Sequence, residues 1–187
     1  KDLTFFTSEV LKKTGLDKFS RDSVTLGLCE TSLRGVDSHG IRLLPHYIDS
    51  ALKGRKNPKP NFKFLKKYTA LATLDADNAF GHSAGMKAID YCSKLADKNG
   101  LGLVLVKNSS HPGAMASMAL RASRNGYACF AFTHADSLML AFNGIDSLFG
   151  TNPFCFSCPS EKKEPYCLDM ATTLISWNKL LTYRKNN

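Results

Sequence analysis

The first third of the chain alternates apolar and polar residues with the period of amphipathic helices. Thr7 or Ser8 can cap a first short helix, and Ser20 can cap a second. Pro45 fits the first turn of a third helix, where its missing N–H costs little. The apolar stripe of that third helix consists of Leu43, Leu44, Tyr47, Ile48, Ala51 and Leu52. The pattern therefore predicts a helical unit over residues 1–60.

Strand-like and helix-like patterns alternate in the rest of the chain, residues 61–187. The expected strands cover residues 70–76, 101–106, 127–132 and 154–158, and a fifth begins at residue 167. The expected helices cover residues 83–99 and 114–125, each closed by a glycine. The runs at 101–106 and 127–132 are continuously apolar, as in parallel strands covered on both faces. With the helix between them they predict a strand-helix-strand crossover, and hence an α/β fold with a mixed sheet.

Two histidines follow these two apolar strands. His111 comes after the first strand and His134 after the second. Because ligands bind beyond the carboxyl ends of parallel strands, this edge is a candidate site. Either histidine could instead serve in capping or packing.

The stretch from Leu33 to Tyr47 concentrates reactive side chains. Gly35 and Gly40 bracket Ser38 and His39, so the backbone can turn on both sides and present the imidazole. A histidine can give or take a proton near neutral pH. The alternative is that Ser38 or Asp37 caps the next helix and His39 is a solvated neighbour.

Charge adds a second feature to the pattern. The net charge is +9, and residues 53–67 contain seven lysines and arginines and no acid. Such a stretch could attract nucleic acid, favour an anionic small substrate or keep a loop solvated. Only Phe62, Phe64 and Tyr68 interleave with it, and no nucleic-acid motif accompanies it. We therefore expect no nucleic-acid partner.

Composition places the chain among soluble globular proteins, with 43% hydrophobic and 22% charged residues. No apolar run approaches the ~20 residues of a membrane span, and the start lacks a secretion signal and an initiator methionine. Most of the six cysteines lie in apolar stretches, which favours reduced thiols in the cytoplasm. Cys155 and Cys158 have zinc-ligand spacing, but on a strand they would point to opposite faces. We therefore expect no metal site and no membrane partner.

Four motifs together resemble the malate/L-lactate dehydrogenase family, the type that includes ureidoglycolate, sulfolactate and diketogulonate enzymes. They occur in family order from the first helix to about residue 184: Arg34-Gly-Val-Asp-Ser-His-Gly40, Asn108-Ser-Ser-His-Pro-Gly113, Gly150-Thr-Asn-Pro153 and Asp169-Met-Ala-Thr-Thr173. This type differs from the Rossmann-fold lactate dehydrogenases. In agreement with that, no GxGxxG motif follows a strand and opens a helix.

The resemblance implies an NAD- or NADP-dependent oxidoreductase that interconverts 2-hydroxy and 2-keto acids, usually as a homodimer on a non-Rossmann α/β fold. Residues 1–60 would form a substrate-side unit and residues 61–187 a cofactor-binding domain. His39 and His111 match histidines that donate the proton in different members, and Ser38 and Tyr47 would line the substrate. The implied cofactor contacts are Ala135, Asp136, Thr151, Asn152, Asp169, Met170 and Ala171.

The sequence departs from the family pattern at two points. The position that commonly carries a carboxylate-binding arginine is Leu43, and Arg42 lies one residue earlier. Arg42 is therefore the candidate for the substrate carboxylate, because its guanidinium can bind that group bidentately. The family pattern also continues well past residue 187, so we expect the fold to be incomplete at the C-terminus of this chain. The alternatives to a dehydrogenase are a catalytically impaired binding or scaffold protein and a nucleic-acid-binding module.

Overall fold

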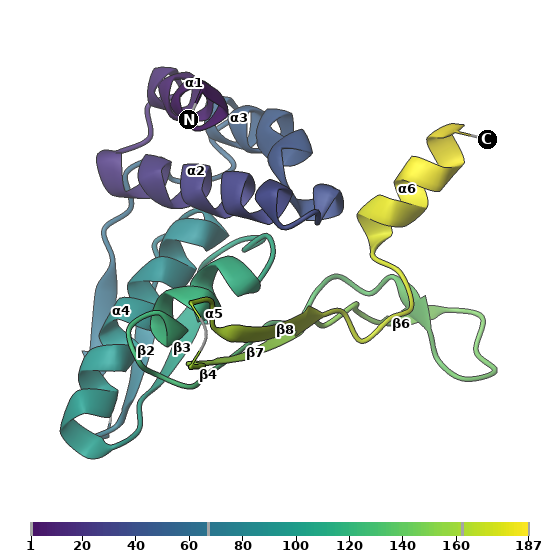
Figure 1. Cartoon of the computed structure of the whole chain (residues 1–187). Coiled ribbons are helices and arrows are strands. Elements are labelled where there is room, and N and C mark those ends of the chain that lie inside the picture. Colours follow the sequence, from purple (N-terminus) through teal and green to yellow (C-terminus); the bar gives the residue numbers. More distant parts are fainter. Residues whose placement is uncertain (1, 67, 162, 187) are drawn as a thin grey trace.

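The computed structural model describes residues 2–66, 68–161 and 163–186 of the chain, so Lys67 of the basic stretch lies outside the described residues. The helices of the N-terminal unit form one layer, which lies above two separate sheets (Figure 1). This layer contains α1 (Asp2–Lys13), α2 (Lys18–Leu33), the short 3-10 turns Asp37–His39 and Ile41–Leu43, and α3 (Leu44–Leu52).

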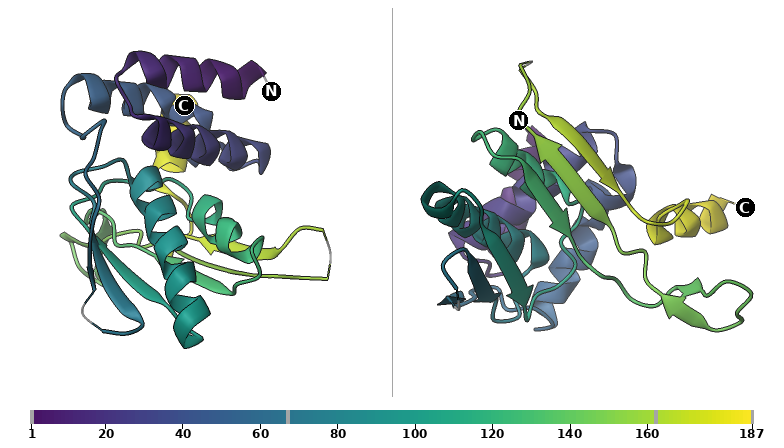
Figure 2. Two further views of the ribbon diagram at one scale, coloured as in Figure 1. Left: turned by 90° about the vertical axis from the view of Figure 1, so that its left-hand side faces the viewer. Right: turned by 90° about the horizontal axis from the view of Figure 1, so that it is seen from below.

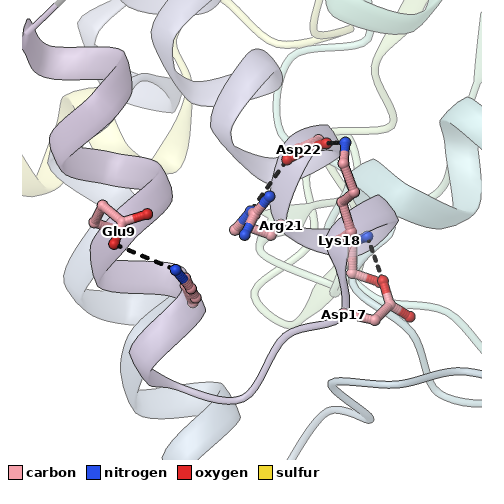
Figure 3. A network of polar contacts seen from close by, with 7 residues as sticks. Glu9, Asp17, Lys18, Arg21 and Asp22 are labelled. Carbon is pink, nitrogen blue, oxygen red and sulfur yellow. Dashed lines mark hydrogen bonds and ion pairs between the residues drawn. The ribbon is translucent and has the colours of Figure 1, made fainter.

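The starts of the first two helices differ from our expectation. Helix α1 already begins at Asp2, so Thr7 lies within it, and the Thr7 hydroxyl donates to the carbonyl of Leu3. Helix α2 is capped by Asp17, whose carboxylate accepts a hydrogen bond from the backbone N–H of Ser20 (Figure 3). Asp17 therefore takes the capping role that we predicted for Ser20, since a carboxylate three residues before an N–H reaches the helix end.

The predicted apolar stripes pack against each other in the helical layer. Leu28 of α2 and Tyr47 of α3 are buried together with Phe80, which precedes α4. Leu52, at the end of the predicted stripe, is instead 68% exposed. Phe80 comes from beyond residue 60, so side chains of both predicted units share one core. The boundary between residues 60 and 61 stays a prediction.

The first sheet contains a parallel crossover, but its two strands lie one strand earlier in the chain than the pair that we predicted. Strand β1 (Lys63–Lys66) pairs antiparallel with β2 (Leu71–Asp75), and β2 pairs parallel with β3 (Leu103–Lys107) across α4 (Gly81–Asn99). The chain leaves α4 at Gly100, whose left-handed φ of 76° favours glycine. Strand β3 is not covered on both faces, because all its residues except Val104 are exposed.

The second sheet contradicts the predicted parallel pairing of residues 101–106 with 127–132. Strand β4 (Cys129–Phe132) lies in the order β4-β7-β8 with β7 (Phe154–Cys158) and β8 (Tyr166–Met170), and both pairings are antiparallel. Helix α5 (Ala116–Ser123) therefore connects two sheets, and it covers only the inner face of the second one. On the outer face, Phe130 and Phe132 are 69% and 67% exposed. A continuous apolar run shows that a strand is hydrophobic on both sides, but it does not identify its partner.

The remaining elements project from the second sheet. Strands β5 (Met139–Leu140) and β6 (Ser147–Phe149) form a small ribbon, and α6 (Trp177–Asn186) follows β8 (Figure 2). In the described parts of the chain, no helix has the length and apolar character to cross a membrane. The six cysteines form no disulfide. Among the described residues, no group of three or more His, Cys, Asp or Glu side chains could hold a metal ion.

Candidate active site

The structure brings His39 and His111 together. His39 lies in the 3-10 turn after α2, and His111 lies in the loop between β3 and α5. Their imidazole rings stack with centroids 5.6 Å apart and an angle of 29° between the planes. Two segments far apart in the sequence therefore place two potential proton carriers side by side.

Each imidazole has a hydroxyl partner at its Nδ1 atom. Ser38 Oγ lies 2.8 Å from His39 Nδ1, and the Tyr47 hydroxyl lies 2.9 Å from His111 Nδ1. Burial raises the pKa of Tyr47, so the phenol keeps its proton. A buried hydroxyl without an acceptor would be unfavourable, and we therefore infer that Tyr47 donates to His111 Nδ1. The proton of a neutral His111 ring then sits on Nε2, at the opposite edge.

The surroundings of the two rings differ in charge. Burial lowers the pKa of His39, the carboxylate of Asp169 raises it, and the guanidinium of Arg42 lowers it. Desolvation by the surrounding protein, together with the charges of His39 and His46, lowers the pKa of His111 to about 4. One side of His111 remains open to solvent. At neutral pH His111 is therefore an uncharged hydrogen-bonding group, whereas His39 has a carboxylate near enough to favour its charged form.

Asp169 is positioned by the start of α5. Its carboxylate accepts a 2.8 Å hydrogen bond from the backbone N–H of Ala116, in the first turn of that helix. Burial raises the pKa of Asp169, while the hydrogen bond from Ala116 and the charge of His39 lower it. Asp169 was predicted as a cofactor contact from its motif. The structure places it between α5 and the His39 turn, so that its charge acts on the imidazole.

Arg42 and Leu43 point to different surroundings. The Arg42 guanidinium is exposed and donates a 2.6 Å hydrogen bond to the hydroxyl of Thr182 in α6. Leu43 packs against the apolar core of the helical layer. Of the two neighbours, only Arg42 combines a positive charge with a position close enough to influence His39. Tyr47, the other predicted pocket residue, is buried beside His111.

The other predicted cofactor residues gather at one end of the second sheet. The pairings of Phe132 with Phe154 and of Phe154 with Met170 place the end of β4, the start of β7 and the end of β8 together. The side-chain oxygen of Asn152 accepts a hydrogen bond from the backbone N–H of Ala135 at 3.0 Å. The hydroxyl of Thr172, next to Ala171, donates to the carbonyl of Thr151. Asp136 is exposed beside these contacts.

Sequence reasoning missed His82, which is fully buried in the first turn of α4. Its ring lies edge-on to Tyr47 with centroids 5.1 Å apart, and neither ring nitrogen has a hydrogen-bond partner among the residues that the structure describes. Burial lowers the pKa of His82 to about 3. A Cβ atom at Gly27 or Gly113 would come within 2.2 or 2.4 Å of the imidazole, so both glycines make room for it. Glycine is unfavourable inside a helix, so Gly27 was the one sign in the sequence that a bulky side chain packs closely against α2.

His134 does not join this cluster. It is an exposed residue just after β4, in the second sheet, whereas His111 follows β3 in the first. The two histidines would share an edge only if β3 and β4 were neighbours in one sheet. Because they are not, the pairing of His111 with His134 at one sheet edge was wrong, and the neighbour of His111 is His39.

Comparisons with known proteins agree on one family. The family model described as malate/L-lactate dehydrogenase matches residues 1–187. The chain is 35% identical over 184 residues to a malate dehydrogenase of Pyrococcus abyssi, covering 98% of this chain and 51% of that protein. It is 32% identical over 177 residues to the ureidoglycolate dehydrogenase (NAD(+)) of Escherichia coli K12, covering 95% of this chain and 51% of that protein.

A solved structure gives the same result for the fold. The crystal structure of malate dehydrogenase from Entamoeba histolytica superposes with a TM-score of 0.94 at 32% identity, covering 98% of this chain and 51% of that chain. The chain thus spans about half the length of the relatives that it matches. The resemblance seen in the four motifs and the α/β fold are confirmed, and the chain belongs to the malate/L-lactate dehydrogenase family.

Proposed function

We propose that this chain supplies the substrate-side catalytic groups of an oxidoreductase that interconverts 2-hydroxy and 2-keto acids with NAD or NADP. The observation that carries this proposal is the stack of His39 on His111, with the charge of Asp169 acting on His39. Two adjacent imidazoles with different electrostatic surroundings suit a reaction in which one oxygen gains or loses a proton. Membership of a dehydrogenase family supports this reading.

The residues at the end of the second sheet fit a nicotinamide dinucleotide. They offer hydroxyl groups from Thr151 and Thr172, a side-chain amide from Asn152 and an exposed carboxylate from Asp136. Hydroxyls and amides can hydrogen-bond phosphate oxygens, and a carboxylate can bind ribose hydroxyls. Met170 and Ala171 end the strand at the same place. When bound there, the nicotinamide would exchange a hydride with the C2 carbon of the substrate.

The two histidines would then have different roles at the C2 oxygen of the substrate. In the direction of reduction, the keto oxygen gains negative charge as the hydride reaches carbon, and it needs a proton to become the hydroxyl. His39, whose charged form Asp169 favours, delivers that proton. Neutral His111 donates a hydrogen bond to the same oxygen from Nε2, because Tyr47 occupies its Nδ1. In the direction of oxidation, His39 takes the hydroxyl proton.

The substrate carboxylate would be held by Arg42. A guanidinium can form two parallel hydrogen bonds to a carboxylate, which fixes the orientation of the acid. Arg42 lies three residues after His39, on the 3-10 turn that leads into α3. Ser38 would complete this side of the site through its contact with His39. A homodimer, a cytoplasmic location and the absence of a nucleic-acid partner stay predictions.

A second candidate function is a binding or scaffold protein without catalysis. Leu43, at the position where the family commonly has an arginine, is the observation that favours it. The two functions differ in whether bound cofactor and acid react.

The test is turnover in the longest polypeptide that contains these residues. Oxidation of malate, lactate, ureidoglycolate and sulfolactate would be followed at the absorption band of the reduced nicotinamide, first with NAD, which the name of one relative specifies. We expect His39→Asn and His111→Asn each to lower turnover by about 10²- to 10⁴-fold. Asn125→Ala, whose side chain donates to the Arg121 carbonyl of α5, is the control. Cofactor binding without turnover would favour the scaffold function, and unchanged rates in both variants would refute the catalytic roles.

A further inference from the structure

We propose that helix α6 holds the turn that carries His39 in place, with Asn178 and Thr182 acting as positioning residues for His39 and Arg42. This inference rests on the proposed function of that turn. It adds two residues from the far end of the chain to the site, and neither belongs to the motifs that identify the family.

The first contact joins α6 to the backbone beside His39. The side-chain amide of Asn178 donates a 3.0 Å hydrogen bond to the carbonyl oxygen of Ser38. The hydroxyl of the same serine is the Nδ1 partner of His39, at 2.8 Å. Asn178 therefore fixes the residue that orients the imidazole, without touching the imidazole itself.

The second contact joins α6 to the arginine on the other side of the turn. The Thr182 hydroxyl accepts a 2.6 Å hydrogen bond from Arg42 and donates a 2.9 Å hydrogen bond to the carbonyl of Asn178. One hydroxyl thus uses both its donor and its acceptor capacity. Because the Arg42 side chain has many rotamers, such a fixed acceptor limits where its guanidinium points.

The turn needs such support on its polar side, because Ile41 and Leu43 pack against the helical core whereas His39 and Arg42 lie at least partly in solvent. Its two 3-10 segments contain no fully buried residue, and Gly35 and Gly40 flank the first of them. On one side, the Ser32 hydroxyl of α2 accepts a hydrogen bond from the backbone N–H of Ile41 at 2.9 Å. On the other side, Asn178 and Thr182 supply the bonds from α6. The turn is therefore attached to two helices, and only one of them lies in the N-terminal unit.

The position of α6 in the chain gives this attachment a second consequence. The helix follows the segment Asp169 to Thr173 after a short connection, and that segment contains the proposed cofactor contacts at the end of β8. In Figure 1, α6 stands beyond the second sheet on the side where α2 ends. A helix bonded to the His39 turn and covalently continuous with β8 links the substrate side to the cofactor side.

The test uses the titration of individual histidines, which does not depend on turnover. Cε1–H resonances of this chain would be followed by NMR against pH in the wild type and in Asn178→Ala. Burial lowers the pKa of His39, so a released turn gains solvent and its pKa rises toward the ordinary value, with a broader resonance. His134 serves as the internal reference. Asn125→Ala is the matched control, because the amide of that asparagine donates to the Arg121 carbonyl of α5, away from the turn.

Two further variants keep the test decisive. Asn178→Gln retains an amide donor and should restore part of the wild-type titration. Thr182→Val keeps the shape of the side chain but removes the hydroxyl that accepts from Arg42, so it should broaden the Arg42 Nε–H signal. In the turnover assay, Asn178→Ala should lower kcat, and Thr182→Val should raise KM for the acid more than it lowers kcat. An unchanged His39 titration in folded Asn178→Ala and an unchanged Arg42 signal in Thr182→Val would overturn the positioning role. If the NMR changes occur but no acid is turned over, the positioning role stands and the proposed function fails.

Discussion

The stacked rings of His39 and His111 each have a hydroxyl at Nδ1, and the carboxylate of Asp169 raises the pKa of His39. Among the described residues, no hydroxyl bonds to the Nε2 atom of either ring. Burial lowers the pKa of both rings, to about 4 at His111, whereas the charge of Asp169 opposes this shift at His39. The difference between the two rings, more than their proximity, suits them to one acid-base reaction.

Removing the charge of Asp169 should move the pH dependence of the reaction. Asp169→Asn keeps a side-chain oxygen for the N–H of Ala116 but removes the charge that raises the pKa of His39. The pKa of His39 then falls, and less of the ring is protonated at neutral pH. We expect the rate of keto-acid reduction at pH 7 to drop, and the pH at which it declines to shift downward.

The measurement is the pH profile of kcat/KM for reduction, with Asp22→Asn, near the start of α2, as the charge-matched control. Asp22 is exposed, and the His39 turn follows the opposite end of that helix. A profile of Asp169→Asn that keeps its midpoint would contradict the assignment of His39 as the proton donor.

Tyr47→Phe should remove the group that selects the tautomer of His111. The phenol donates to Nδ1, so its loss allows the ring proton to sit on either nitrogen. We expect a loss of stability of about 1 kcal/mol for the hydrogen bond, together with a lower kcat. The ¹⁵N chemical shifts of His111 report the tautomer directly. A ring that keeps its proton on Nε2 in Tyr47→Phe would show that Tyr47 does not select it.

Arg42→Lys tests which residue binds the substrate carboxylate. Lysine keeps the charge but cannot form two parallel hydrogen bonds, so binding should weaken by about 1.5–3 kcal/mol, or roughly 10- to 100-fold in KM. Lys53→Ala, at the end of α3, removes a nearby charge outside the site and should leave KM unchanged. An unchanged KM in Arg42→Lys would mean that another group holds the acid.

His82 should make the fold sensitive to acid. Burial lowers its pKa to about 3 in the folded chain, whereas an unfolded histidine has a pKa of about 6.5. Between these values the unfolded chain binds a proton that the folded chain does not, so stability is full above pH 6.5 and falls as the pH is lowered. The expected slope from this residue is about 1.4 kcal/mol per pH unit.

The corresponding variant is His82→Leu, which removes the titrating group and two buried nitrogens without partners. We expect the free energy of unfolding, measured with urea between pH 7 and pH 4, to depend less on pH than in the wild type. His46→Leu, on the exposed side of α3, is the matched control. Equal slopes in His82→Leu and the wild type would place the acid sensitivity elsewhere, with His111 as the next candidate.

The helices were easier to predict from the sequence than the sheet pairing. The period of Leu44, Tyr47 and Ala51 identified the buried side of α3, because helical periodicity is a local property. The partner of a strand is not local. The apolar runs around Val104 and Phe130 fitted a parallel pair, but β3 lies in one sheet and β4 in the other. The sequence also did not identify the cap of α2, because Asp17 and Ser20 are both good capping residues.

The site was predictable where a motif marks it. His39 and His111 were found from glycine-flanked turns and from the family motifs, and the structure shows their rings in contact. His82 was missed because α4 begins at Gly81, two residues before the predicted start. Asn178 and Thr182 could not be found from the sequence, because their contacts join positions 140 residues apart.

The most direct test is a structure of the longest polypeptide that contains these residues, with a nicotinamide cofactor and a non-reacting 2-keto acid analogue bound. We predict that the analogue's C2 oxygen lies within hydrogen-bond distance of Nε2 of both His39 and His111, and that Arg42 binds its carboxylate. An analogue that contacts only one of the two imidazoles, or binds away from both, would contradict it.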